Sequence, residues 1–503
     1  MPAIFIAGTL LFVCLFAAIV LYRAWVCDDS YITFRVVENF HSGYGFRWNT
    51  AERVQVFTHP LWMLVMTFIY AFTHELYLTS LFLSIILSMG AVILLILTEK
   101  KNLGLWVGIL LLSLSSAFVD FSTSGLENPL SHFLIAIFLF TYFKGGNETN
   151  DRRIFWLSLI AGFACLNRFD HILIYLPVFV HLIIRNRKWF KEELKVFLGF
   201  LPLVIWLVFS TIYYGYPLPN TFYAKVGDWL PLDVIMGQGL KYCLHTLKND
   251  PITGLTIIVN LALVGINFKR ERMPLALGVI SYILYVIWIG GDFMEGRFFT
   301  TIFIGALFQL VHYDIPKLNL KQIACIIPAI IIISLFSSIP TLGFSDQGFI
   351  ETWEDGIVNE RVFYADTTGL FRDGVFHTYH EHPWKWEGER LKEGCVEKGK
   401  CHVAFNNIGF AGVAAGPDVY IVDRYGLGSA LLARIPPEVT DDWRIGHFYR
   451  KIPIGYLPYL RTGELAHVES RATQELIQKV EIITVSPVFL EDRWKLIFDF
   501  LMD

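Results

Sequence analysis

The sequence is poor in charged residues. Only 17% of its 503 residues are Asp, Glu, Lys or Arg, whereas a soluble domain carries about 25%. The net charge of −4 gives no reason to expect a nucleic-acid partner. Hydrophobic residues make up 54%, which is more apolar surface than one core buries. The runs 4–20, 81–97 and 323–339 reach or approach the length that crosses a hydrocarbon layer of ~30 Å, so we expect the chain to lie in a membrane.

Cysteine is also scarce, and its spacing excludes several kinds of site. The seven cysteines form no CxxC pair and no spacing typical of zinc. Cys395 and Cys401 lie close together in a polar stretch, where a disulfide requires an oxidising compartment; the sequence leaves open whether they are bridged. A small-x-small cleavage site after the first apolar run is absent too, and Val26 before Cys27 does not fit a lipoprotein signal. We therefore expect an uncleaved first helix.

The segments between the apolar runs are of two kinds. Short basic segments are expected in the cytoplasm by the positive-inside rule: 99–102, 144–153, 185–195, 267–272 and 312–321. The other segments mix acids, aromatics, glycine and proline, and alternation places them together on the outer face: 27–59, 122–129, 167–171, 214–251 and 290–297.

About eleven spanning helices satisfy this alternation. We expect them near residues 3–22, 77–98, 103–119, 127–143, 154–166, 170–184, 196–213, 252–267, 275–290, 298–311 and 323–340. Residues 59–72 are too few to span upright and predict a helix near the outer surface.

The predicted fold is thus a polytopic α-helical membrane protein with two domains. A transmembrane domain covers residues 1–340, with its first outer loop at 26–59, and an extracytoplasmic domain covers residues 341–503. Within the outer domain, 419–422 predicts a strand and 473–480 a helix, so we expect a mixed α and β domain.

Two adjacent carboxylates, Asp28 and Asp29, follow the first apolar run. Neighbouring carboxylates at a membrane boundary repel each other and are costly to desolvate, so they usually serve a function. One is a candidate general base for a hydroxyl, and the other is a candidate for holding a metal or orienting a substrate. The alternative is a solvated pair that ends the helix.

The other outer segments carry further polar residues with competing interpretations. Glu127 is either a site residue or a helix start whose charge favours the dipole. Arg168 and Asp170 either bind a ligand or pair with each other. Arg297, in a segment with three glycines, suits a lipid phosphate because arginine binds phosphate bidentately; the alternative is an arginine that snorkels at the membrane edge. His59 either starts a helix or donates to a sugar hydroxyl.

Several of these motifs resemble one family. They are Asp28-Asp29-Ser-Tyr-Ile-Thr-Phe-Arg35, Thr58-His59-Pro60-Leu61-Trp62, Ser124-Gly125-Leu126-Glu127, Arg168-Phe169-Asp170-His171, Gly290-Gly-Asp-Phe-Met-Glu-Gly-Arg297 and Val422-Asp423-Arg424-Tyr425-Gly426-Leu427. The sequence is similar in them to the mycobacterial terminal β-(1→2) arabinofuranosyltransferases, membrane glycosyltransferases of the GT-C class.

The resemblance implies a GT-C membrane fold with an outer cap. It also implies a decaprenyl- or related polyprenyl-phosphate arabinofuranose donor, an acceptor hydroxyl outside the cytoplasm, and Asp28 and Asp29 as the catalytic pair. The outer domain is shorter than in that family, and the chain is rich in Ile, Phe and Lys rather than Ala. The acceptor therefore stays open between arabinan, a lipopolysaccharide sugar and a pilin-like surface protein.

We expect the donor phosphate to be neutralised by Arg297 together with Lys225 or Arg168, and Asp29 or Asp28 to deprotonate the acceptor. The sequence leaves open whether a divalent cation (Mg, Mn or Ca), held by Asp28 or Asp292, also takes part. The candidates for binding the donor phosphate or sugar are Arg35, His59, Glu127, Arg168, Asp170, His171, Asn220, Tyr223, Lys225, Asp292, Glu295 and Arg297.

The expected location is a bacterial inner membrane, with the active site and the C-terminal domain facing the periplasm. Alternatives are transfer of another sugar, such as mannose or aminoarabinose, and a transporter or flippase for a lipid-linked sugar. Inverting or retaining stereochemistry and the oligomeric state are open.

Overall fold

The computed structural model describes residues 2–98, 104–144, 151–186, 189–227, 229–315, 318–343, 354–396, 401–440 and 443–502. The basic segment 99–102 lies outside the described residues, as do parts of 144–153, 185–195 and 312–321. Contacts divide the chain into two units. Unit 1 is Met1–Val26, Tyr77–Leu203 and Leu232–His380, and unit 2 is Cys27–Leu76, Val204–Pro231 and Glu381–Asp503. The predicted boundary at residue 340 stays a prediction.

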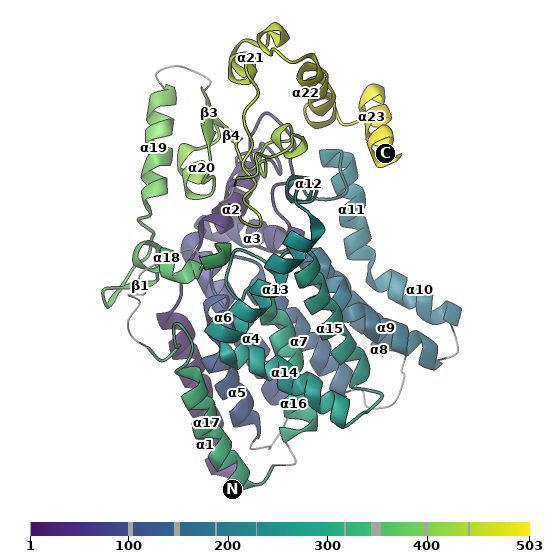
Figure 1. Cartoon of the computed structure of the whole chain (residues 1–503), viewed down its shortest axis with the longest axis vertical. Coiled ribbons are helices and arrows are strands. Elements are labelled where there is room, and N and C mark those ends of the chain that lie inside the picture. The colour runs from purple at the N-terminus through teal and green to yellow at the C-terminus, as the bar shows by residue number, and fades with distance from the viewer. Residues whose placement is uncertain are drawn as a thin grey trace. The chain divides into compact units, whose positions relative to one another are not determined.

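Within the described residues, unit 1 is helical except for a short antiparallel hairpin (Figure 1). Its elements are α1 (Pro2–Tyr22), α4 (Tyr77–Thr98), α5 (Gly104–Leu114), α6 (Ser116–Asp120), α7 (Asn128–Lys144), α8 (Asp151–Asn167), η1 (Phe169–His171), α9 (Ile172–Asn186), α10 (Trp189–Gly199), α13 (Leu232–Asn249), α14 (Pro251–Ile266), α15 (Met273–Trp288), α16 (Phe299–Tyr313), α17 (Leu320–Ser334), η3 (Glu354–Gly356), α18 (Glu360–Thr368), β1 (Phe371–Arg372) and β2 (Val375–Phe376).

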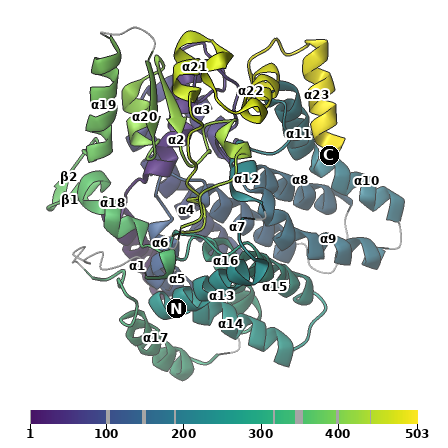
Figure 2. The ribbon, with the colours of Figure 1, turned by 45° about the horizontal axis from the view of Figure 1, so that its top comes forward.

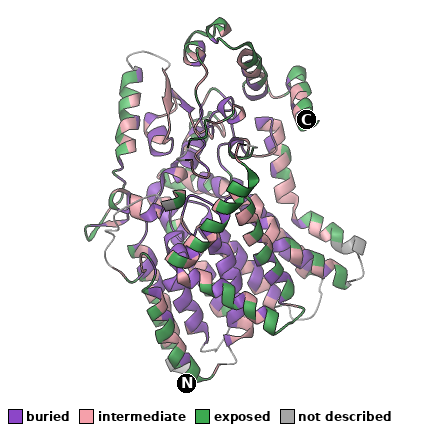
Figure 3. Cartoon of the chain, viewed as in Figure 1, coloured by how far each residue is buried: buried purple, intermediate pink, exposed green. Residues whose placement is uncertain are grey.

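Helices α5, α7 and α16 form the core of unit 1. Residues 299–311 of α16 are buried without interruption, and α5 is buried along almost its whole length. Such all-round apolar helices are typical of the interior of a bundle, and α7 packs against α4, α8 and α16. The buried residues of unit 1 gather on these helices in Figure 3, whereas α1 leaves Leu10 and Leu11 exposed at 58% and 68%.

By length and composition, two helices of the described residues can cross a membrane, Phe5–Tyr22 and Tyr77–Thr98. The number is up to four if the bent pairs α10 with α11 (Leu201–Tyr214) and α13 with α14 are each one span. Helices of 10–17 residues that are also apolar include α5, α15, α16 and α17. The count of eleven spanning helices stays a prediction.

Helices occur near the predicted positions, with several local differences. The predicted helix 196–213 is divided between α10 and α11, and the predicted helix 323–340 ends at Ser334. The predicted helix 103–119 is divided into α5 and α6, because the Ser115 side chain accepts a hydrogen bond from Phe118 N (3.0 Å) and starts a new helix. Residues 232–249, expected within an outer loop, form α13. Helix α14 then begins at Pro251, directly after Asp250, whose carboxylate accepts from Thr253 N (3.1 Å).

Unit 2 combines helices with a two-stranded parallel sheet. Its elements are α2 (Asp28–His41), α3 (Pro60–Thr73), α11 from Val204 on, α12 (Asn220–Lys225), α19 (Pro383–Val396), β3 (Cys401–Phe405), α20 (Phe410–Ala415), β4 (Val419–Asp423), η4 (Leu432–Arg434), α21 (Tyr456–Thr462), η5 (Leu465–His467), α22 (Arg471–Thr484) and α23 (Glu491–Met502).

The structure agrees with the strand and the helix that the sequence predicts in the C-terminal segment. Strand β4 occupies the predicted strand 419–422, and α22 includes the predicted helix 473–480. Strands β3 and β4 pair from Cys401↔Val419 to Phe405↔Asp423, side by side as Figure 2 shows. Cys395 and Cys401, left open by the sequence, form a disulfide that links α19 to β3.

Candidate active site

The two aspartates of the first outer segment lie on a helix rather than in a loop. Asp28 and Asp29 are the first two residues of α2, which follows Cys27. Negative charge in the first turn of a helix is stabilised by the dipole and the unpaired N–H groups there. The polar residues of α2, such as Glu38, hid this helix from an analysis of apolar runs.

Asp28 is tied to another part of unit 2. Its side chain is 5% exposed, and its two oxygens accept the backbone N–H groups of Gly409 (3.0 Å) and Phe410 (2.6 Å). These N–H groups stand at the start of α20. Burial is the main reason that the pKa of Asp28 is raised to about 7; the two N–H bonds oppose the shift and Asp29 adds to it.

Gly409 is required by this contact. A Cβ added there would stand 1.8 Å from the carbonyl oxygen of Asp28, closer than any side chain can approach. Asp29, by contrast, is partly exposed. Asp29 is therefore the member of the pair with access to a solute, whereas Asp28 anchors α20.

A second group of predicted residues forms an ion-pair cluster in unit 1. Arg168 donates to both oxygens of Asp170 (Nε to Oδ1 3.1 Å, Nη2 to Oδ2 2.7 Å), as one interpretation of the sequence predicted. Arg168 Nη1 also donates to Glu127 Oε1 (2.9 Å). Arg297 reaches the same oxygen (3.4 Å) and lies 3.6 Å from Asp292 Oδ2. We call Glu127, Arg168, Asp170, Asp292 and Arg297 the arginine cluster.

The arginine cluster is buried and held from several elements. Its side chains are at most 12% exposed. Both guanidinium groups lie over the ring of Phe298, at 4.6 Å and 5.8 Å. Tyr282 OH donates to Asp170 Oδ2 (2.9 Å), and Asn167 Nδ2 donates to Glu127 O (3.0 Å). Glu127 thus joins two arginines and does not merely start α7. With three carboxylates to two guanidiniums, the cluster is locally acidic.

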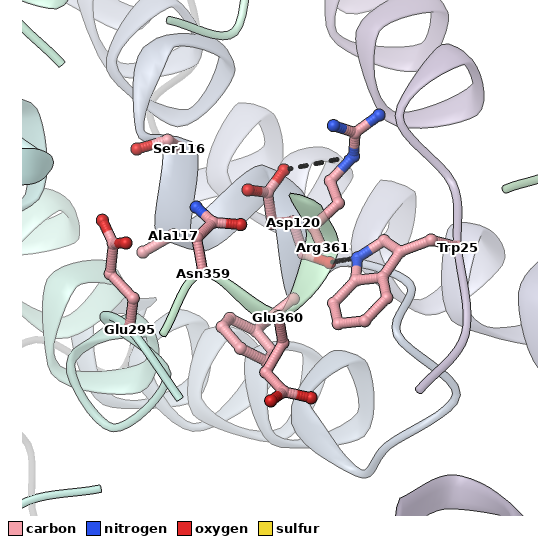
Figure 4. A pocket seen from close by; sticks show the side chains of 9 residues that line it. Trp25, Ser116, Ala117, Asp120, Glu295, Asn359, Glu360 and Arg361 are labelled. Atoms are coloured by element: carbon pink, nitrogen blue, oxygen red, sulfur yellow. Dashed lines mark hydrogen bonds and ion pairs between the residues drawn. The ribbon is translucent and has the colours of Figure 1, made fainter. Parts of the chain in front are cut away.

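Two other predicted residues of unit 1 lie beside different partners. His171 is buried with its ring edge-on to Tyr282, at 5.7 Å between centroids. Glu295 lines a small pocket with Asp120, Asn359 and Arg361 (Figure 4). Burial, with the charges of Asp250 and Asp120, raises the pKa of Glu295 to about 8.

The remaining predicted residues of unit 2 have mainly structural contacts. His59 Nε2 is 2.7 Å from Thr33 Oγ1, at the start of α3. Arg35 is buried, donates to the carbonyls of Gly416 (3.1 Å) and Val419 (2.8 Å), and lies over the Trp48 ring.

The loop before α12 is fixed by similar contacts. Asn220 Nδ2 donates to the carbonyls of Gly426, Leu427 and Ser429, and its Oδ1 accepts from Arg434 (3.0 Å). Tyr223 is half-buried, with Arg434 5.2 Å from its ring. Lys225 is exposed. The donor-binding roles of these residues stay predictions.

The two candidate metal ligands, Asp28 and Asp292, already accept backbone N–H groups. In the part of the chain that the structure describes, no three His, Cys, Asp or Glu side chains are grouped so that they could hold an ion. Both oxygens of Asp28 accept N–H groups, and Asp292 Oδ1 accepts its own neighbour Phe293 N (2.9 Å).

Two buried acids escaped the sequence analysis. Asp120 pairs with Arg23 (2.9 Å) and lies 3.7 Å from Arg361. Asp250 Oδ2 accepts from Ser115 Oγ (3.1 Å) and Ala117 N (2.9 Å). For Asp120 the available signal was a lone charge directly after the apolar run 105–119, because such a charge is costly in a membrane unless it is paired.

No family model matches the chain. It is similar to the terminal β-(1→2)-arabinofuranosyltransferase of Mycobacterium tuberculosis, with 25% identity over 516 residues, which cover 84% of this chain and 80% of that protein. The protein of the same name from Corynebacterium glutamicum is 27% identical over 320 residues, 55% of this chain and 46% of that one. Among solved structures, ArnT from Cupriavidus metallidurans bound to undecaprenyl phosphate has a TM-score of 0.48 and 11% identity, over 86% of this chain and 77% of that one. The resemblance that the motifs predict is therefore confirmed by two curated relatives.

Proposed function

We propose that the chain is a membrane glycosyltransferase that moves an arabinofuranosyl group from a polyprenyl-phosphate donor to an acceptor hydroxyl outside the cytoplasm. The observation that carries the proposal is the similarity to the M. tuberculosis arabinofuranosyltransferase along 84% of the chain. The acceptor is a cell-envelope glycan or a surface protein.

The location follows from the same proposal. The chain lies in a bacterial inner membrane, with the active site and the C-terminal domain 341–503 facing the periplasm. Its Cys395–Cys401 disulfide supports this side, because disulfides persist in oxidising compartments.

Asp29 is proposed as the general base. It is partly exposed, whereas both oxygens of Asp28 already accept backbone N–H groups. A base must come within hydrogen-bond reach of the hydroxyl that it deprotonates, and exposure gives Asp29 that reach. Asp28 then acts as a positioning residue, which holds the start of α20 against α2.

Arg168 and Arg297 are proposed to bind the donor phosphate. Each guanidinium presents a planar set of N–H donors that matches a phosphate bidentately. In the structure both arginines donate to Glu127 Oε1. A donor phosphate that binds these arginines competes with the Glu127 carboxylate. Because both guanidinium groups are already oriented before the donor binds, they can stabilise the charge of the leaving phosphate.

The test is transfer of labelled arabinofuranose from synthetic polyprenyl-phosphate-arabinose by the purified full chain. Arabinoside and peptide acceptors form one panel, and polyprenyl-phosphate-mannose serves as a second donor. We expect product from the wild type and none from Asp29→Asn. Asp492→Asn, an exposed acid of α23 in the same unit, is the matched control and should retain transfer.

Each other outcome has a defined meaning. Full transfer by Asp29→Asn would exclude Asp29 as the base. Product from the mannose donor alone would replace the sugar. Movement of the lipid-linked donor across a vesicle membrane, without transfer to any acceptor, would support the transporter alternative instead.

A further inference from the structure

A basic pocket of unit 1 is lined by none of the predicted site residues. Its volume is about 250 Å³, somewhat less than the about 300–1,000 Å³ typical of pockets for drug-sized ligands. We call it the basic pocket; the charged and histidine side chains of its lining are Arg153, His181, Arg185, Lys269, Glu271 and His312.

Four of the five segments that the sequence places in the cytoplasm meet here. Arg153 belongs to the segment 144–153, Arg185 begins 185–195, Lys269 and Glu271 lie in 267–272, and His312 begins 312–321. These segments are far apart in sequence, so the fold gathers their basic residues at one place. The pocket is therefore at the predicted inner surface of the membrane, opposite to the outer segments.

The charge of the lining favours an anion. Three permanent cations, Arg153, Arg185 and Lys269, face one carboxylate, Glu271, so the lining carries a formal charge of +2 with both histidines neutral. Arg185 and Lys269 are exposed side chains of this lining, within reach of a ligand that arrives from the solvent.

Aromatic residues hold the cations in place and give the pocket an apolar side. Arg153 donates to the Tyr142 carbonyl oxygen and lies 5.6 Å from the Tyr142 ring. Lys269 Nζ lies 5.4 Å from the Tyr313 ring. Phe143 stacks on His312 with 4.4 Å between ring centroids. A ligand with a phosphate beside hydrocarbon matches cations and rings arranged in this way.

We propose that the basic pocket binds the phosphate headgroup of an anionic phospholipid of the inner leaflet. Basic pockets between membrane helices on the cytoplasmic side are suited to such headgroups. The proposal depends on the orientation predicted from the basic segments and not on the transfer activity. It gives the chain a second lipid site, on the opposite side from the proposed donor.

The test compares two double variants of the full chain in detergent. Arg185→Gln/Lys269→Gln removes two cations that line the pocket. Arg152→Gln/Arg270→Gln removes two cations from equally exposed neighbouring positions outside the lining. Both variants lose the same charge from the same surface, so a difference between them reports the pocket itself.

Native mass spectrometry would measure binding of phosphatidylglycerol against phosphatidylcholine. We expect the wild type to prefer phosphatidylglycerol, the pocket variant to bind it at least about tenfold more weakly, and the control variant to remain close to the wild type. Equal losses in the two variants, or no preference between the lipids, would overturn the proposal. Displacement of the lipid by inorganic phosphate alone would assign the pocket to a soluble phosphate and overturn the lipid assignment.

Discussion

Asp28 and Asp29 share a peptide bond and have different surroundings. The Asp28 carboxylate accepts two N–H groups at the start of α20, whereas Asp29 is partly exposed. Removal of the carboxylate charge should therefore mainly lower stability at Asp28 and mainly abolish transfer at Asp29. Amide replacement keeps the size of each side chain and removes its charge.

Asp28→Asn should destabilise the fold by about 1–3 kcal/mol, because one backbone N–H then faces an NH2 group instead of an acceptor. Asp29→Asn should stay within about 0.5 kcal/mol of the wild type and lose transfer. Thermal unfolding in detergent, with a transfer assay on the same samples, separates the two effects. The reverse pattern would contradict the assignment of anchor and base.

Arg168 is the central cation of the arginine cluster, since it donates to both Asp170 and Glu127. Arg168→Gln leaves buried carboxylates without their partner and should cost about 3–5 kcal/mol of stability. Arg471→Gln is the control, because Arg471 is exposed and pairs with Glu475 at the surface. Equal thermal stability of the two variants would show that the cluster does not depend on this arginine.

At the scale of elements, α20 is positioned by a contact that needs glycine. A Cβ at Gly409 would overlap the Asp28 carbonyl at 1.8 Å, whereas a Cβ at Gly394 of α19 would meet nothing within 4 Å. Gly409→Ala should destabilise the chain by about 1–3 kcal/mol or more through overpacking. Gly394→Ala should be neutral or stabilising by about 0.5–1 kcal/mol, because alanine suits a helix better. Circular dichroism melts of both variants test this.

The sequence predicted the apolar helices well, because a run of apolar residues is a local property. It predicted β4 and α22 for the same reason. It missed α2 and α13, whose mixed polar residues resemble a loop when no packing partner is known. The Arg168–Asp170 pair was readable from its spacing, whereas the contact of Asp28 with Gly409 joins residues 381 positions apart and has no local signal.

At the scale of the molecule, three buried acids of unit 2 make stability depend on pH. Burial raises the pKa of Asp28 and of Glu52 to about 7 and that of Asp423 to about 6, from ordinary values of 3.8 for Asp and 4.5 for Glu. A folded pKa above the unfolded value means that the folded chain binds the proton more tightly. The stability from this protonation is complete below the unfolded pKa and is lost as pH rises through the folded pKa.

We therefore expect Asp28 to lower the melting temperature of the detergent-solubilised chain as pH rises from about pH 5 to about pH 7.5. Burial lowers the pKa of His382 and of His447, which act in the opposite direction, so the test is the difference between the wild type and Asp28→Asn. The melting temperature of the wild type relative to that of the variant should fall over this interval, and a difference that does not change with pH would contradict the raised pKa of Asp28.

Unit 2 is assembled from three separate stretches of chain, 27–76, 204–231 and 381–503. Asp28 comes from the first, Asn220 from the second, and both bind backbone groups of the third. A gene fragment that encodes only residues 381–503 therefore lacks the partners that hold α20 and the segment 426–429. Recombinant expression of residues 381–503 as one contiguous piece should yield a product without cooperative unfolding. Isolation of unit 2 requires the first two stretches to be fused to the third by linkers.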